Sequence, residues 1–120
     1  MPFFDWSKMP LKEKSPGMSG KVVTGEKMQL AFVKLAYGVE TNHSHMNEQI
    51  GYILSGEVEL TIGSEKKACI KGDAYLVPSN VRHGFKVLSK EGVEYIEIFS
   101  PPKQENQEWY EYDVVRRKEQ

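Results

Sequence analysis

The stretch EVELTIGSE at residues 57–65 decides the fold class of this chain. Its apolar side chains, Val58, Leu60 and Ile62, alternate with polar ones, which is the period of a β-strand with one buried face. Gly63-Ser64-Glu65 follows at once and predicts a tight turn into a second strand. The stretch therefore indicates an antiparallel β-hairpin.

Short β-type runs continue on both sides of this hairpin, and turn residues such as Lys71-Gly72-Asp73 separate nearly all of them. The other predicted strands are residues 28–36, 50–54, 67–70, 74–77, 84–88 and 93–99. No helical apolar period long enough for a core helix occurs before residue 104. We therefore expect an all-β domain, a barrel or sandwich of short antiparallel strands.

Length and composition limit the chain to one globular domain. It has 120 residues, of which 39% are hydrophobic and 28% are charged, values typical of a soluble protein. Proline and glycine interrupt residues 1–20, so we expect an irregular N-terminal arm there. Residues 21–102 should form the β-barrel domain, and residues 103–120 a C-terminal tail.

Charge, hydropathy and cysteine content exclude several partners. The net charge of −1 argues against nucleic acid, because phosphate binding usually needs a clear basic excess. No apolar stretch approaches the length of a membrane span, so we expect no membrane partner. Cys69 is the only cysteine, so no intramolecular disulfide can form, and the N-terminal residues lack the pattern of a secretion signal. We expect a cytoplasmic protein.

The chain's three histidines fall in two short segments, HSHMNEQ at residues 43–49 and VPSNVRH at residues 77–83. On an extended strand, His43 and His45 point to the same face, roughly 7 Å apart along the backbone. Two imidazoles on one face bury little apolar surface, whereas a bent segment could direct both to one ion. The sequence therefore predicts a metal site, with His83 as a third candidate ligand.

Glycine and proline around these histidines complete a pattern that resembles the paired motifs of the cupin superfamily. The first segment reads G-x4-H-x-H-x3-Q-x6-G over residues 38–56, and the second reads G-x5-P-x4-H over residues 72–83. Cupins are small antiparallel β-barrels or jelly rolls that hold one divalent metal ion, so the resemblance implies this fold and this cofactor. Gln49 stands where that family usually has a glutamate ligand, and Val87 replaces the asparagine that closes the second motif.

A closer resemblance, to the KdgF-type pectin-degradation proteins among the cupins, accounts for Gln49. It rests on HSHMNEQI at residues 43–50, on Thr61-Ile62-Gly63 and on Phe99-Ser100-Pro101-Pro102. The resemblance implies four metal ligands, which are His43, His45, Gln49 and His83. It also implies that the protein linearises 4,5-unsaturated uronates, sugar acids released from pectin or alginate, to open-chain keto-deoxyuronates.

The same resemblance assigns three further residues to the site. The family's catalytic acid falls on Glu97, its aromatic residue on Phe99 and its basic residue on Lys103, so glutamate replaces aspartate and lysine replaces arginine. These replacements keep charge but change reach and bidentate geometry.

Strand parity places Val93, Tyr95, Glu97 and Phe99 on one face of the last predicted strand. If that face lines the barrel, Glu97 is a buried carboxyl near a cation and can act as a general acid or base.

The neutral ligand set has a chemical consequence of its own. Three imidazoles and an amide leave a divalent ion with its full charge, which favours an anionic small-molecule substrate, Lewis-acid chemistry, and isomerisation over oxygenation. Nickel, zinc, iron, manganese and copper all suit imidazole, so the ligand types do not select one. Glu48 is an alternative ligand to Gln49, and strand parity points these two side chains to opposite faces.

Several of these candidate residues could have a structural role instead of a functional one. Glu97 could be a solvated strand residue, and Lys103 a surface cation rather than a substrate contact. Tyr52 and Trp109 could stack on a sugar ring, or they could serve packing or a dimer contact. Cys69 is interpreted as a small core residue, not as a nucleophile.

A metal-dependent enzyme acting on a small sugar acid is thus the leading functional hypothesis. One alternative is a non-catalytic cupin module that binds a small anionic ligand, and another is an iron-dependent dioxygenase. The sequence shows no helix-turn-helix segment, which disfavours a direct role in transcription. We expect a homodimer, because small cupins commonly pair.

Overall fold

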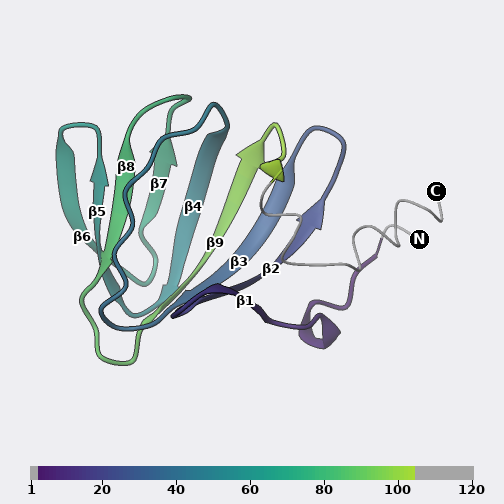
Figure 1. Cartoon of the computed structure of the whole chain (residues 1–120), viewed down its shortest axis with the longest axis horizontal. Coiled ribbons are helices and arrows are strands. Elements are labelled where there is room, and N and C mark those ends of the chain that lie inside the picture. Colours follow the sequence, from purple (N-terminus) through teal and green to yellow (C-terminus); the bar gives the residue numbers. More distant parts are fainter. Residues whose placement is uncertain (1–2, 105–120) are drawn as a thin grey trace.

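The computed structural model describes residues 3–104, which form two antiparallel sheets (Figure 1). A short 3-10 helix, η1 (Trp6–Lys8), precedes the strands β1 (Lys12–Ser15), β2 (Met18–Thr24), β3 (Gln29–Leu35), β4 (Glu48–Ser55), β5 (Glu57–Ile62), β6 (Glu65–Ile70), β7 (Ala74–Val77), β8 (His83–Val87) and β9 (Val93–Ser100). The six-stranded sheet has the order β1-β2-β3-β9-β4-β7, and the three-stranded sheet has the order β6-β5-β8. The predicted all-β fold of short antiparallel strands is confirmed.

The hydrophobic core consists of the side chains on the inner faces of the strands. Along β9, Val93, Tyr95, Glu97 and Phe99 are buried, while the residues between them are more exposed. The same alternation occurs along β3 and β4. Because successive side chains of a strand point to opposite faces, one face of the last strand lies inside, as its parity predicts.

Most of the predicted strands are confirmed, and residues 57–62 and 74–77 coincide with β5 and β7. The turn between β5 and β6 contains Gly63, with a φ of 60°, and the turn between β6 and β7 contains Gly72, with a φ of 96°. Glycine adopts these values without the steric cost that a side chain adds. Both predicted turns are therefore present.

The N-terminal arm contains regular strands from residue 12 onward, which corrects the expectation of an irregular arm over residues 1–20. β1 lies wholly within these residues, and β2 begins at Met18. Pro16 and Gly17 form the turn between the two strands, so they interrupt the pattern without ending regular structure. β2 pairs with β3 along its whole length. β3, the next strand in the chain, supplies the hydrogen bonds that make residues 18–24 a strand.

The connection between β3 and β4 runs along β8 and brings the two histidine motifs together. His43 and His83 exchange two backbone hydrogen bonds of 2.9 and 2.8 Å, and the Thr41 N–H donates to the Phe85 carbonyl at 2.8 Å. Gly84 permits this approach, since a Cβ there would lie 2.1 Å from the Thr41 carbonyl oxygen. The backbone pairing therefore sets the position of His43 against β8.

Two further expectations concern the termini and the membrane. Within residues 3–104, no helix combines the length and hydropathy needed to cross a bilayer. Of the predicted C-terminal tail, only residues 103 and 104 belong to the described part of the chain, so Trp109 lies outside it.

Candidate metal centre

The side chains of the three histidines converge on one point. His43 lies in the connection before β4, His45 lies closer to that strand, and His83 begins β8. Their ligand atoms all lie within 4.8 Å of one another, and the ring centroids are separated by 5.3, 4.6 and 4.8 Å. The two motifs thus form a single three-histidine cluster, which could hold a metal ion.

Backbone carbonyls determine which nitrogen faces this cluster in two of the rings. Nδ1 of His45 lies 2.9 Å from the Asn47 carbonyl oxygen, and Nδ1 of His83 lies 2.9 Å from the Val81 carbonyl oxygen. Because a carbonyl only accepts, each Nδ1 carries the proton and each Nε2 presents a lone pair. Nε2 of His83 is buried without a hydrogen-bond partner among the described residues, a costly state that a bound cation would relieve.

Gln49 directs another lone pair to the same point. Its side chain is 2% exposed, and its Nε2 donates to Oε2 of Glu97, which turns its Oε1 to within 3.0 Å of His45 Nε2. These two facing atoms are both acceptors when His45 Nδ1 is protonated, and a shared cation would stabilise the arrangement. Glu48 is exposed on the other face of β4. The geometry therefore favours Gln49 over Glu48 as a ligand.

The donor set fits a divalent ion held by His43, His45, Gln49 and His83. The pKa of His43 is lowered to about 4 by loss of solvent around its ring and then by the charge of Lys103 and the neighbouring imidazoles. Burial likewise lowers the pKa of His83. Both rings are neutral near neutral pH, which is the form that binds metal.

Glu97 lies beside the cluster and is 5% exposed, so it is an interior residue and not a solvated one. Its Oε2 accepts hydrogen bonds from the Gln49 amide and from the Tyr75 hydroxyl, the latter at 2.6 Å. Burial raises the pKa of Glu97 to about 7, although these hydrogen bonds and the charge of Lys103 act in the opposite direction. A carboxyl with this pKa can both donate and accept a proton near neutral pH.

A cavity of about 400 Å³ adjoins these groups, a size that suits a small molecule. Its wall contains the polar residues Lys14, Ser15, Thr41, His43, Gln49, Glu97 and Lys103, and the apolar residues Met18, Val33, Phe85, Tyr95 and Phe99. The structure therefore brings the predicted acid, aromatic and basic residues into one cavity with two of the candidate ligands.

Lys103 is a buried residue of the cavity wall and not a surface cation, with an exposed fraction of 9%. Its Nζ lies 5.7 Å from the centre of the Phe99 ring. The Gln29 amide donates to the Lys103 carbonyl at 3.1 Å, and the Asn47 amide donates to the Pro101 carbonyl at 2.6 Å. These two anchors hold the segment after β9 against the barrel, which accounts for the burial of Lys103.

Tyr52 is not brought to the site, which corrects its expected place among the substrate-binding residues. Gln49, Gly51 and Ile53 occupy the inner face of β4. Parity therefore puts Tyr52 on the outer face, where it is 43% exposed.

Two residues of the site, Lys14 and Tyr75, are absent from the sequence-based prediction. The pairing of β1 with β2 is irregular between Glu13 and Ser15, and an irregularity of this kind redirects the side chain at its centre. Lys14 accordingly lines the cavity. Tyr75 shares the inner face of β7 with Val77. The alternation along this strand predicts that Tyr75 is buried, but it does not predict the contact between Tyr75 and Glu97.

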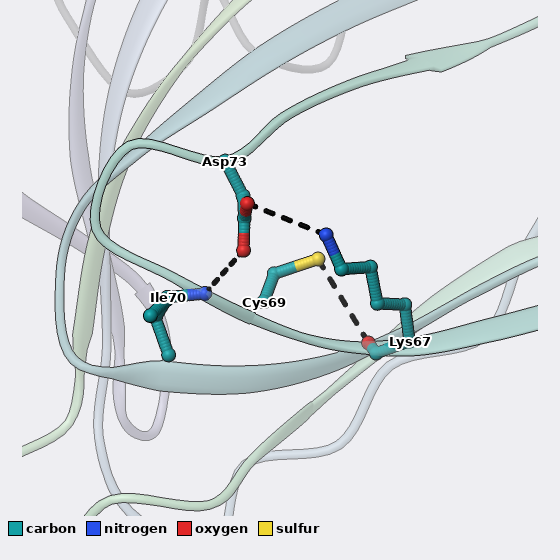
Figure 2. A network of polar contacts seen from close by, with 4 residues as sticks. All are labelled: Lys67, Cys69, Ile70 and Asp73. Carbon is teal, nitrogen blue, oxygen red and sulfur yellow. Dashed lines mark hydrogen bonds and ion pairs between the residues drawn. The ribbon is translucent and has the colours of Figure 1, made fainter.

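Cys69 lies in β6 and is buried, as expected for a small core residue, and Figure 2 shows it together with Lys67, Ile70 and Asp73. Its Sγ lies 3.8 Å from the Lys67 carbonyl oxygen, and burial raises the pKa of the thiol. Asp73 accepts a hydrogen bond from the Ile70 N–H at 2.8 Å and pairs with Lys67 Nζ at 3.3 Å. This network closes the turn between β6 and β7, so the segment serves the fold.

Comparisons with known proteins agree with this architecture. Residues 31–99 match the family described as the cupin domain. The pectin degradation protein KdgF of Dickeya dadantii (strain 3937) is 33% identical over 102 residues, which cover 82% of this chain and 92% of that protein. The structure of KdgF from Halomonas sp. matches with a TM-score of 0.79 at 28% identity, over 86% of this chain and 97% of that chain. An RmlC-like cupin from Shewanella frigidimarina NCIMB 400 has a TM-score of 0.81 at 21% identity, over 88% and 95% of the two chains, and supports the fold alone.

Proposed function

This chain belongs to the cupin family, and on that premise we propose that it is a metal-dependent enzyme that opens the ring of 4,5-unsaturated uronates. The observation that carries the proposal is the Glu97 carboxyl, which is buried in the cavity wall and hydrogen-bonded to the candidate ligand Gln49. The similarity to a pectin degradation protein supports the substrate class, because unsaturated uronates are sugar acids released from pectin or alginate.

The charge of the cavity supports an anionic substrate. Lys14 and Lys103 line it, and the charges of both lysines act on His43. Glu97 is the only carboxylate among the described residues that line the cavity, so a uronate carboxylate would meet positive charge there. A divalent ion bound by the histidines and Gln49 would supply Lewis-acid polarisation of a substrate oxygen.

The proposed reaction is an isomerisation, so it consumes no oxidant, reductant or second substrate. The hydroxyl group on the anomeric carbon loses its proton. An aldehyde then forms at this carbon as its bond to the ring oxygen breaks. The ring oxygen takes that electron pair and becomes the enolate oxygen attached to C5 of the C4=C5 alkene, and a proton added at C4 converts this enolate to a ketone. Glu97 accepts the first proton and returns it, so its own state is restored.

Loss of the conjugated-alkene absorbance tests this function. With 4,5-unsaturated galacturonate or its alginate-derived counterpart, the metal-loaded protein should accelerate the loss relative to buffer and to metal-stripped protein. Equal decay in all three samples with both sugars would refute the proposal. Saturable binding without acceleration would then favour the binding module, and oxygen uptake with small diketones or phenolic acids would favour the dioxygenase.

A second test addresses Gln49. We expect Gln49→Glu to retain metal but to bind acetate or a uronate more weakly, because a carboxylate ligand lowers the net charge of the ion. Each tenfold loss of affinity corresponds to about 1.4 kcal/mol in a calorimetric titration. Glu48→Gln, on the outer face of β4, is the matched control. Unchanged anion affinity in Gln49→Glu would remove Gln49 from the ligand set.

A further inference from the structure

Tyr75, Gly51 and Glu97 lie in one row across three neighbouring strands. In the register of the six-stranded sheet, Gly51 of β4 is opposite Tyr75 of β7 and also opposite Glu97 of β9. All three positions are on the buried face. Neighbouring strands lie about 4.8 Å apart, so a side chain at position 51 would stand between the other two residues.

The missing side chain of Gly51 allows Tyr75 to reach Glu97. A Cβ at position 51 would lie 2.2 Å from both Cζ and the hydroxyl oxygen of Tyr75. The tyrosine ring therefore occupies space over β4 that the side chain of any other residue at position 51 would fill. Its hydroxyl ends 2.6 Å from Oε2 of Glu97. Gly51 does not have a positive φ, so the need for glycine here is one of space and not of backbone conformation.

Aromatic packing holds the Tyr75 ring in this direction. Phe85 meets it edge to face with 5.8 Å between ring centroids, and Phe85 in turn stacks on Tyr95 at 4.9 Å. Phe85 and Tyr95 both line the cavity. The hydroxyl of Tyr75 is thus the end of a packed aromatic cluster, and its position relative to Glu97 is set by three strands.

Both donors to Glu97 meet the same carboxyl oxygen. Tyr75 and Gln49 each donate to Oε2, and within residues 3–104 no protein donor reaches Oε1. Two hydrogen bonds to one oxygen fix the rotation of the carboxyl group and favour an acceptor role for that oxygen. Oε1 is left as the atom that can exchange a proton with a molecule in the cavity.

We propose that Tyr75 is a positioning residue, which uses the space left by Gly51 to hold Oε2 of Glu97 so that Oε1 serves the proton transfer. This role rests on the proposed function. It requires no contact between Tyr75 and the substrate, and it explains a buried tyrosine hydroxyl and a sterically required glycine with one arrangement.

Tyr75→Phe removes the hydroxyl and keeps the ring. We expect kcat with the uronate to fall roughly 100-fold, the usual cost of a misplaced catalytic group, while KM and metal content stay unchanged. Tyr52→Phe is the matched control, because it removes a tyrosine hydroxyl from the outer face of β4 and should change neither constant. If Tyr75 had a purely structural role, Tyr75→Phe would lower thermal stability without a selective loss of kcat at unchanged KM.

Gly51→Ala tests the same contact by crowding. Its methyl group should displace the Tyr75 ring and lower kcat by a similar factor. The double variant Gly51→Ala/Tyr75→Phe should lose no more than the larger single loss, because both changes act on one contact. Additive losses would contradict the shared mechanism, and if Gly51→Ala fails to fold, Tyr75→Phe alone decides.

Infrared spectroscopy tests the contact without the reaction. At a pH at which Glu97 is protonated, its C=O stretch should move to higher wavenumber in Tyr75→Phe and be absent in Glu97→Gln. An unshifted band, or an active parent whose kcat equals that of Tyr75→Phe, would overturn the positioning role alone. A shifted band with an inactive parent protein would instead overturn the proposed function, and the positioning role with it.

Discussion

We expect Glu97→Gln to slow uronate ring opening by roughly 10²- to 10⁴-fold, the usual contribution of a general acid or base, with no loss of metal. The substitution preserves the shape of the side chain and removes its titratable proton. Oε2 of Glu97 accepts from Gln49 and Tyr75, and an amide oxygen can accept in its place, so the local structure should persist. The rate is measured by the alkene absorbance at saturating sugar and fixed pH.

Glu94→Gln is the matched control, since Glu94 lies on the same strand and pairs with Lys34 at 3.8 Å on the exposed face. Its rate should equal that of the parent. Elemental analysis of each variant separates two failures of the hypothesis. Loss of metal together with activity would mean that Glu97 supports the centre structurally, whereas equal rates in Glu97→Gln and parent would remove it from the mechanism.

We expect His45→Ala to strip the protein of its divalent ion and to abolish the reaction. Nε2 of His45 faces the Gln49 amide oxygen at 3.0 Å, and its ligand atom lies within 4.8 Å of those of His43 and His83. Losing a direct ligand should weaken metal binding by more than the roughly 10- to 100-fold that loss of an outer-shell partner costs. Elemental analysis after dialysis measures the bound metal directly.

Thermal unfolding gives a second readout of the same change. Metal that binds the folded state should raise the midpoint of the parent and of Ser44→Ala, an exposed neighbour of the ligands, but not that of His45→Ala. A parent protein that takes up no nickel, zinc, iron, manganese or copper, and whose midpoint does not change, would refute the metal centre.

Local periodicity determined most of the fold from the sequence. The alternation of Val58, Leu60 and Ile62 specifies β5 because a strand with one buried face repeats every two residues. The same parity groups Glu97 with Val93, Tyr95 and Phe99 and separates Glu48 from Gln49, and the structure shows which of these faces is buried. The spacing of the histidines, with its glycines and prolines, predicts their cluster. The strand faces depend on residues that are close together in the sequence, whereas the cluster joins two separate segments whose motif pattern is recognisable in each.

The structure alone decided the features that depend on contacts between distant segments. β9 lies between β3 and β4, although nearly sixty residues separate it from β3 in the sequence, and Lys103 is buried because Gln29 and Asn47 anchor the chain after β9. Tyr52 is a case in which the sequence-based expectation is wrong. Its aromatic ring suggested a contact with a sugar, whereas the pleat of β4 turns the Tyr52 side chain outward.

What the sequence determined by itself was therefore the class of fold, the faces of its strands and the residues that can bind a metal. Which side chains share the cavity with that centre was decided only by tertiary structure, which brings together residues of both sheets and of the segments between and after their strands. Tyr75 reaches Glu97 because β4 separates their strands and has glycine at the crossing point. Strand order arises from the packing of the whole chain, and no local pattern of residues encodes it.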